Sequence, residues 1–105
     1  SYYPNITGDE KMLDFKNQTS VEIINTIRAL HPYLPTYITI GNKYLIVNPY
    51  KVKITKQFGQ PNEIVDKIVK TRSLTICAKD KEGIKFSDLK LYKFSFMTKR
   101  FIKSL

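Results

Sequence analysis

Residues 37–47 read Tyr-Ile-Thr-Ile-Gly-Asn-Lys-Tyr-Leu-Ile-Val, and they are the clearest indication of the fold class. β-Branched and aromatic residues, which favour extended structure, stand on both sides of the pair Gly41-Asn42. Two residues of this type between two such runs are a signature of a β-hairpin. The stretch therefore predicts two antiparallel strands, Tyr37–Ile40 and Lys43–Val47, joined by a tight turn.

Further strands are expected on the C-terminal side of this hairpin. Residues 51–54, Lys-Val-Lys-Ile, alternate between charged and apolar, which predicts a strand with one cationic and one apolar face. Gly59 and Pro61 indicate a loop over residues 55–62. Three more strands are predicted at 63–69, 74–79 and 84–91, joined by polar turns at 71–72 and 80–83. The last strand is expected to contain a bulge at Ser87-Asp88, where the apolar positions change phase.

One helix is expected before the hairpin. Thr19 and Glu22 have the spacing of a capping box, in which each side chain bonds the backbone N–H of the other residue. Apolar residues then recur at helical intervals, and Pro32 ends the helix because its ring disfavours helical geometry in the preceding residue. The apolar stripe consists of Val21, Ile23, Ile24, Ile27 and Leu30. A final helical turn over residues 98–103, capped by Thr98, is expected at the other end.

The order of these elements predicts the architecture. One helix, five or six short antiparallel strands and a terminal helical turn are typical of a mainly β domain of the α+β type. We expect an OB-like small antiparallel β-barrel preceded by one α-helix, with a short C-terminal helical turn. Pro4 and Gly8 lie in an opening segment without periodicity, so residues 1–18 are interpreted as an interdomain strap. Residues 19–105 then form the OB-like domain.

The composition argues against several kinds of site. A single cysteine, Cys77, rules out an internal disulfide, and with one histidine, His31, no zinc site with several Cys or His ligands can form. No glycine-rich phosphate loop or nucleophile motif occurs, so we expect no catalytic and no metal-binding residue in this chain. No apolar run is long enough to cross a bilayer, and the chain is expected to be soluble and cytoplasmic, without membrane contacts.

Net charge is the strongest compositional feature. It is +9 overall; residues 1–35 carry three basic and four acidic side chains, whereas residues 36–105 carry fifteen and five. Such an excess on the β-rich part favours RNA or DNA as a partner, although lysines are also ordinary solvent-facing residues. The candidate RNA-binding residues are Lys43, Lys51, Lys53, Lys56, Lys79, Lys85 and Lys90. Tyr50 and Phe58 are candidates for stacking on unpaired bases, the alternative being packing at the core or rim.

Five groups of short motifs are spaced along almost the whole chain. They are Leu13-Asp-Phe15; Glu22-Ile23 followed by Ile27-Arg-Ala-Leu30 and Pro32; Gly59-Gln-Pro-Asn-Glu-Ile-Val65; Leu74-Thr-Ile-Cys-Ala78 with Asp80 and Gly83; and Leu89-Lys-Leu91 with Met97-Thr98 and Phe101-Ile102. Each motif alone is weakly specific. Their order and spacing resemble the formyltransferase C-terminal domain family, which includes the C-terminal domain of methionyl-tRNA formyltransferase.

The resemblance implies a non-catalytic domain of a larger enzyme. In this family an N-terminal Rossmann-like domain transfers a formyl group from the cosubstrate 10-formyltetrahydrofolate to the amino group of methionyl-tRNA. The resemblance therefore implies two partners: tRNA, bound non-specifically through the basic face, and a Rossmann-like catalytic domain of the same polypeptide. It implies no cofactor in this chain itself. Two alternatives stay open: an accessory or dimerisation domain of a sugar N-formyltransferase, and a free-standing OB-type RNA-binding protein.

Overall fold

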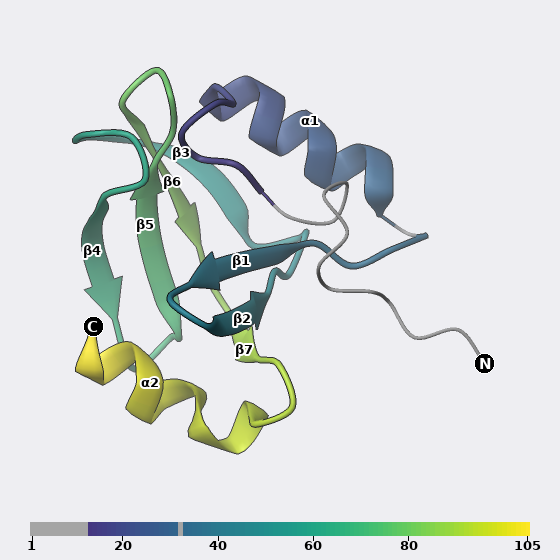
Figure 1. The fold of residues 1–105 in the computed structure, drawn as a ribbon, viewed down its shortest axis with the longest axis vertical. Helices are drawn as coiled ribbons and strands as arrows, with labels where there is room; N and C mark the ends of the chain where they lie inside the picture. Colours follow the sequence, from purple (N-terminus) through teal and green to yellow (C-terminus); the bar gives the residue numbers. More distant parts are fainter. Residues whose placement is uncertain (1–12, 32) are drawn as a thin grey trace.

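The computed structural model describes residues 13–31 and 33–105, and within them it contains two α-helices, one 3₁₀ turn and seven strands (Figure 1). In chain order these are α1 (Ser20–Leu30), β1 (Tyr37–Ile40), β2 (Lys43–Ile46), β3 (Val52–Phe58), β4 (Ile64–Ile68), β5 (Ser73–Cys77), β6 (Glu82–Phe86), β7 (Lys90–Leu91), the 3₁₀ turn η2 (Ser95–Met97) and α2 (Thr98–Ser104). Most of the predicted strap, residues 1–18, lies outside the described residues.

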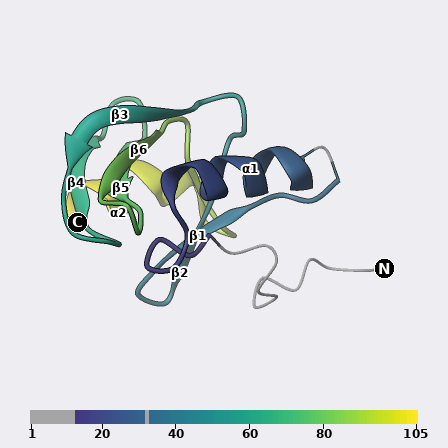
Figure 2. The same cartoon turned by 90° about the horizontal axis from the view of Figure 1, so that it is seen from above.

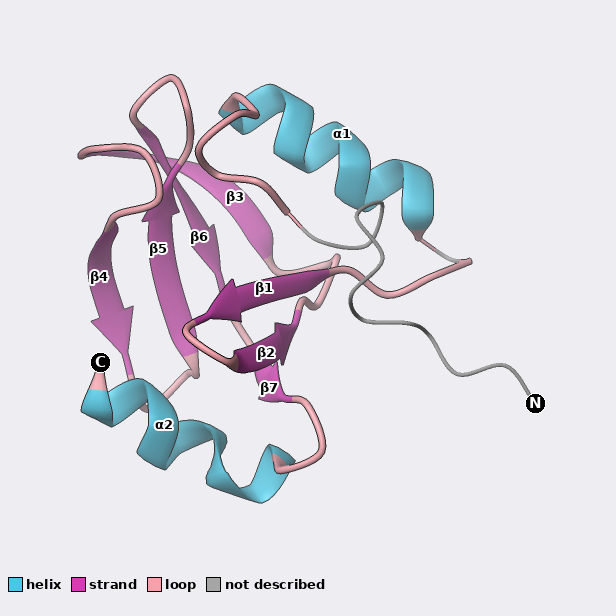
Figure 3. Ribbon diagram, viewed as in Figure 1, coloured by secondary structure: helices cyan, strands magenta, loops and turns pink. Residues whose placement is uncertain are grey.

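The strands form two antiparallel sheets. The first has the order β1-β2-β7 and the second the order β3-β6-β5-β4. Figure 3 shows the strands of the first sheet running across those of the second, with α1 and α2 at opposite ends of the domain. The mainly β class with one leading helix and a short C-terminal helix is confirmed. In the described part of the chain the strands do not close into a barrel, because no ladder joins one sheet to the other.

The predicted hairpin is confirmed. Ile40 and Lys43 are Cα partners, so Gly41 and Asn42 alone connect β1 and β2. Gly41 has a φ of +61°, a left-handed conformation that glycine adopts without steric cost. Leu45 on β2 is fully buried, so the hairpin turns one face toward the core.

The predicted strand over residues 84–91 is in fact two strands in different sheets. β6 and β7 are separated by a corner at Asp88, whose φ of +60° is left-handed. The Asp88 N–H donates to Thr71 O at 3.0 Å. The next N–H, that of Leu89, donates to Arg72 O at 3.1 Å, so the β4–β5 turn holds the corner. The change of phase is therefore real, but it marks a point where the chain changes sheet and not a bulge within one strand.

β3 is longer than the sequence indicates. Residues 55–58, predicted as part of a loop, continue this strand, which pairs with β6 as far as the partners Phe58 and Glu82. The register shifts between Ile54 and Phe58, and Figure 2 shows β3 curving around the side of the second sheet. β3 is an edge strand with mostly exposed side chains, and residues 55–58 lack the apolar alternation that identifies its first residues as a strand.

The capping box of α1 is confirmed. The Glu22 N–H donates to Thr19 Oγ1 at 3.3 Å, and the Thr19 N–H donates to Glu22 Oε1 at 2.8 Å. Ile23 and Ile27 are buried as predicted, whereas Val21, expected in the same stripe, is 58% exposed. Residues two apart do not share a helix face, so Val21 cannot follow Ile23 into the core.

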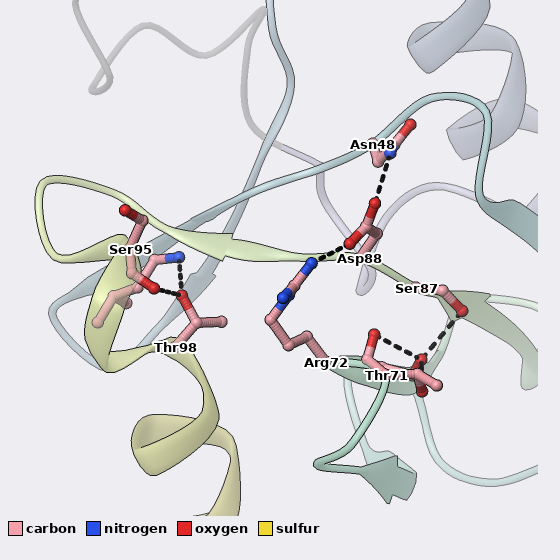
Figure 4. A network of polar contacts seen from close by, with 9 residues as sticks. Asn48, Thr71, Arg72, Ser87, Asp88, Ser95 and Thr98 are labelled. Carbon is pink, nitrogen blue, oxygen red and sulfur yellow. Dashed lines mark hydrogen bonds and ion pairs between the residues drawn. The ribbon is translucent and has the colours of Figure 1, made fainter.

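Thr98 does not cap α2, contrary to the prediction. Met97 occupies the N-cap position without a side-chain hydrogen bond, and Thr98 is the first residue of the helix. The buried Thr98 hydroxyl donates to Ser95 O at 2.6 Å and accepts from the Leu91 N–H at 2.8 Å (Figure 4). The Thr98 hydroxyl therefore links α2 to β7. The 3₁₀ turn η2 precedes the helix directly, and no side chain caps the helix there.

The core lies between the two sheets and α1. Fully buried residues come from each of these elements, among them Ile23 of α1, Leu45 of β2 and Phe86 of β6. Phe15 packs edge-on against Phe86, with ring centroids 5.8 Å apart. Because successive side chains on a strand point to opposite faces, Lys85 faces away from the core that Phe86 enters. The outer face of β6 is therefore cationic.

Candidate nucleic-acid interface

Three of the predicted lysines meet on the outer face of the second sheet. Lys51 precedes β3, and its carbonyl accepts from the Ser87 N–H at 2.9 Å. Lys53 on β3 and Lys85 on β6 are direct Cα partners. Two hollows of about 320 and 480 Å³ adjoin here and share Lys51, Lys85 and Ser87. We call this surface the cationic groove; its cations are Lys51, Lys53, Lys70, Arg72 and Lys85.

Lys70 and Arg72 complete the groove, and the sequence does not single them out. Both belong to the connection between β4 and β5, where Arg72 has a left-handed φ of +52°. The only sequence signal is the predicted polar turn at residues 71–72. Nothing in the residue pattern indicates that this turn folds back beside Lys51, because hydrogen bonds to the distant corner at Asp88 place it there.

One ion pair lies within the groove. Arg72 Nη2 donates to Asp88 Oδ1, and Asn48 Nδ2 donates to the other carboxylate oxygen at 3.2 Å (Figure 4). The hydrogen bond from Arg72 and its charge hold the pKa of the Asp88 carboxyl below its ordinary value, with smaller contributions from Asn48 and Lys90. Among the described residues this is the only ion pair. Asp88 thus offsets Arg72, and within residues 13–31 and 33–105 the four lysines of the groove have no carboxylate partner.

Hydroxyl groups form a polar row beside these lysines. Ser73 Oγ lies 2.7 Å from Thr71 Oγ1 and 3.0 Å from Ser87 Oγ (Figure 4). Ser73 is buried, and Ser87 lines both hollows of the groove. Ammonium groups beside hydroxyls match the oxygens of a phosphate, which accepts hydrogen bonds from both without conveying base sequence.

The other predicted lysines do not line the groove. Lys90 is exposed on β7 beyond the corner. Lys43 Nζ lies 5.7 Å from the centroid of the Phe94 ring, over an apolar hollow beside α2. Lys56 is exposed on β3, and Lys79 is exposed after β5, where its N–H donates to a backbone carbonyl before α1. The seven predicted lysines therefore do not form one face.

The two predicted aromatic residues have different surroundings. Tyr50 borders the cationic groove, its ring is 78% exposed, and its hydroxyl lies 2.8 Å from His31 Nε2. The His31 and Tyr50 rings meet edge-on, with centroids 5.0 Å apart. Phe58 is 66% exposed at the far end of β3 and lines neither hollow of the groove. Neither ring belongs to the core.

Groups with catalytic or metal-binding chemistry are sparse. The described residues contain no set of three His, Cys, Asp or Glu side chains that could hold a metal ion. Cys77 is buried, and burial together with the charges of Glu63 and Asp80 raises the pKa of its thiol. Such a thiol is a poor nucleophile, because the thiolate is the reactive form. No described helix is long and apolar enough to span a membrane.

Comparison with known proteins establishes the family. The model for the formyl transferase C-terminal domain matches residues 5–100, so this chain belongs to that family, and the resemblance carried by the five motif groups is confirmed. A methionyl-tRNA formyltransferase from Natranaerobius thermophilus is 29% identical over 69 residues. The match covers 63% of this chain but 22% of that protein, so the chain corresponds to a minor part of its relative's length.

Proposed function

We propose that this chain is the tRNA-binding part of a formyltransferase that acts on methionyl-tRNA. Membership of the formyltransferase C-terminal domain family supports the enzyme class, and the similarity to a methionyl-tRNA formyltransferase supports the acceptor. In this proposal the cationic groove holds phosphates of the tRNA without reading its sequence. Binding is then non-specific, with a dissociation constant on the order of 10⁻⁴ to 10⁻⁶ M, and it weakens steeply with salt.

The grouping of unpaired cations carries this proposal. The register of β3 and β6 sets Lys53 directly opposite Lys85, and like charges in that position destabilise a sheet. Lys51 and Lys70 add charge to the same surface. Among the described residues that line it, the only carboxylate is that of Asp88, which Arg72 already engages. On a surface that contacts only solvent, placing these lysines side by side would not stabilise the fold. A bound polyanion, by contrast, removes the repulsion and releases its own counterions.

The reaction itself is assigned to another part of the parent enzyme. A Rossmann-like catalytic domain with 10-formyltetrahydrofolate as cosubstrate would transfer the formyl group in the cytoplasm. The contribution of this chain is to hold the tRNA and raise its concentration near that domain. No cofactor is assigned to the chain itself.

The test is a salt-dependent titration of tRNA against two variants that lose the same charge. The first carries Lys51→Ala, Lys53→Ala and Lys85→Ala in the groove; the second carries Lys43→Ala, Lys99→Ala and Arg100→Ala beside α2. The groove variant should make the negative slope of log affinity against log salt shallower by about 3, or about one per lost phosphate contact. The α2 variant should keep a slope close to that of the unmodified chain.

The outcomes separate the remaining possibilities. Equal losses in both variants would show that net charge alone matters and would overturn the groove as the binding surface. Full affinity in the groove variant would do the same. If the unmodified chain does not bind tRNA even at low salt, the tRNA proposal fails and the sugar N-formyltransferase alternative gains support.

A further inference from the structure

Another hollow shares Tyr50 with the cationic groove. It has a volume of about 410 Å³ and opens between the C-terminal end of α1, the segment before β1 and the β2–β3 connection. Ile27 and Val47, which line it, are both buried. We call this site the aromatic hollow; its rings are those of His31, Tyr33 and Tyr50. Its volume falls within the range of about 300–1,000 Å³ found for small-ligand sites.

The rings at this hollow expose an unusual amount of apolar surface. Tyr33 is 82% exposed and Tyr50 is 78% exposed, although both border a concave site. Exposed aromatic rings around a depression are typical of ligand-binding surfaces and contribute little to the core. The hollow is therefore suited to a flat ligand that covers one or both rings.

Tyr50 makes contacts that orient its ring at the edge of the hollow. Its hydroxyl lies 2.8 Å from His31 Nε2, and the two rings meet at 82°. Its N–H donates to Asn48 Oδ1 at 3.0 Å, while Asn48 Nδ2 donates to Asp88, the carboxylate that holds Arg72 in the groove. One chain of polar contacts thus joins the aromatic hollow to the cationic groove. A ring fixed in this way loses little freedom when a ligand stacks on it.

We propose that the aromatic hollow binds an unpaired nucleobase of the same RNA whose phosphates lie in the cationic groove. Tyr50 lines both sites, so a single-stranded RNA that contacts the lysines of the groove can continue directly into the hollow. Every base offers a flat face for stacking on tyrosine, so the hollow needs no particular sequence. Proline-rich peptides also bind aromatic grooves, but they make no use of the adjoining cations. This inference rests on the proposed function.

The test compares two strands of about ten nucleotides that carry equal numbers of phosphates. One is single-stranded oligoadenylate and the other is its abasic counterpart. The unmodified chain should bind oligoadenylate about tenfold more tightly than the abasic strand, and Tyr50→Ala should abolish that preference. The affinity of Tyr50→Ala for the abasic strand, and the salt slope, should stay unchanged because the ring carries no charge.

Two further variants control for structural effects. Tyr50→Phe keeps the ring and should restore most of the base preference, whereas a role limited to the hydrogen bond with His31 predicts the same loss as Tyr50→Ala. Phe96→Ala removes a ring that is 83% exposed in η2, away from both sites, and should change nothing. Circular dichroism checks that each variant is folded.

Each outcome bears on one proposal or on both. Salt-dependent binding of both strands without a base preference overturns the base site and leaves the proposed function intact. Failure of tRNA and of both strands to bind overturns the proposed function and, with it, the base site. Binding of a proline-rich peptide that Tyr50→Ala abolishes, without any base preference, assigns the hollow to peptides and overturns the inference.

Discussion

The cationic groove and the apolar hollow beside α2 are both positively charged, but their cations have different surroundings. In the groove, Lys53 stands opposite Lys85 among hydroxyl groups, and no carboxylate in the part of the chain that the structure describes pairs with either lysine. Beside α2, Lys43 stands over the Phe94 ring, and Arg100 borders an apolar surface. A cation over an aromatic ring already has a favourable partner, whereas a cation opposite another cation has an unfavourable one. The surroundings of the charges therefore distinguish a candidate binding surface from an ordinary basic one.

The difference arises from the elements that carry the charges. α2 is a short amphipathic helix that buries Thr98 and Ile102 and turns Lys99, Arg100 and Lys103 toward solvent. Lys103 follows Lys99 by four residues and Arg100 by three, so these cations are neighbours on the helix surface, but their long exposed side chains can point apart. In the second sheet the register of two strands fixes each lysine against its neighbour. Repulsion between the cations of α2 is relieved when their side chains rotate apart. Repulsion between Lys53 and Lys85 is harder to relieve, because the pairing of β3 with β6 sets the distance between their Cα atoms.

Among the substitutions that distinguish the groove from the α2 region, Gly83→Ala is expected to have the largest effect on stability. It disturbs the pairing of β3 with β6 and leaves α2 unchanged. A Cβ at this position would lie 2.9 Å from both Gln57 O and Thr75 Cγ2. Because the first of these atoms is backbone, β3 must shift away from β6. Such overpacking costs about 1–3 kcal/mol. We expect a fall of this size in the free energy of unfolding, measured with urea, together with weaker tRNA binding.

Ser104→Ala on the exposed end of α2 serves as the control for this experiment. Its hydroxyl donates only to the Phe101 carbonyl, at 2.6 Å, so the change should be close to neutral. If Gly83→Ala keeps both the urea midpoint and the tRNA affinity of the unmodified chain, β3 and β6 are not packed as closely as the structure has them.

A smaller, pH-dependent effect is expected from Asp88→Asn, which removes a carboxylate from the groove. Arg72 holds the pKa of this carboxyl below its ordinary value in the folded chain. The ion pair therefore adds stability above the ordinary carboxyl pKa of about 4 and loses it as the pH falls through the lower, folded value. The unmodified chain should be more stable than Asp88→Asn at neutral pH, and the difference should shrink below about pH 4.

Urea midpoints measured from about pH 7 to about pH 3 check this prediction. A difference that persists unchanged at the acidic end would show that Asp88 acts through its shape and not its charge. Because the substitution leaves the groove more positive, tRNA binding at neutral pH should be retained.

Sequence reasoning succeeds here where neighbouring residues decide the structure. The capping box of Thr19 and Glu22 and the turn at Gly41-Asn42 depend only on local geometry, and both are confirmed. The alternation of residues 51–54 likewise predicts that Lys51 and Lys53 project outward, and both side chains are exposed.

Sequence reasoning fails where a distant strand decides. Residues 55–58 look like a loop but pair with β6, and the segment 84–91 looks like one strand but divides between two sheets at Asp88. Arg72 enters the groove only because hydrogen bonds between its turn and that corner hold it there. No pattern of neighbouring residues indicates such long-range pairing, so the contribution of the β4–β5 turn to the groove could not be predicted from the sequence.

The smallest effects are expected from one substitution made at two positions, Lys53→Gln in the groove and Lys43→Gln beside α2. Each removes one charge from a strand and keeps a side chain of similar length. Lys53→Gln should raise the free energy of unfolding by about 0.2–1 kcal/mol, because it relieves the repulsion from Lys85. Lys43→Gln should lower it by about 0.5–1 kcal/mol, because the cation over the Phe94 ring is lost.

The opposite signs make this pair informative despite its small size. Only Lys53→Gln should also weaken tRNA binding, so at that position the chain would gain stability and lose affinity together. Urea denaturation at low salt, where surface repulsion is least screened, gives the best resolution. Shifts of the same sign at both positions would mean that net charge outweighs local surroundings, and the distinction between the groove and the α2 hollow would then have no energetic basis.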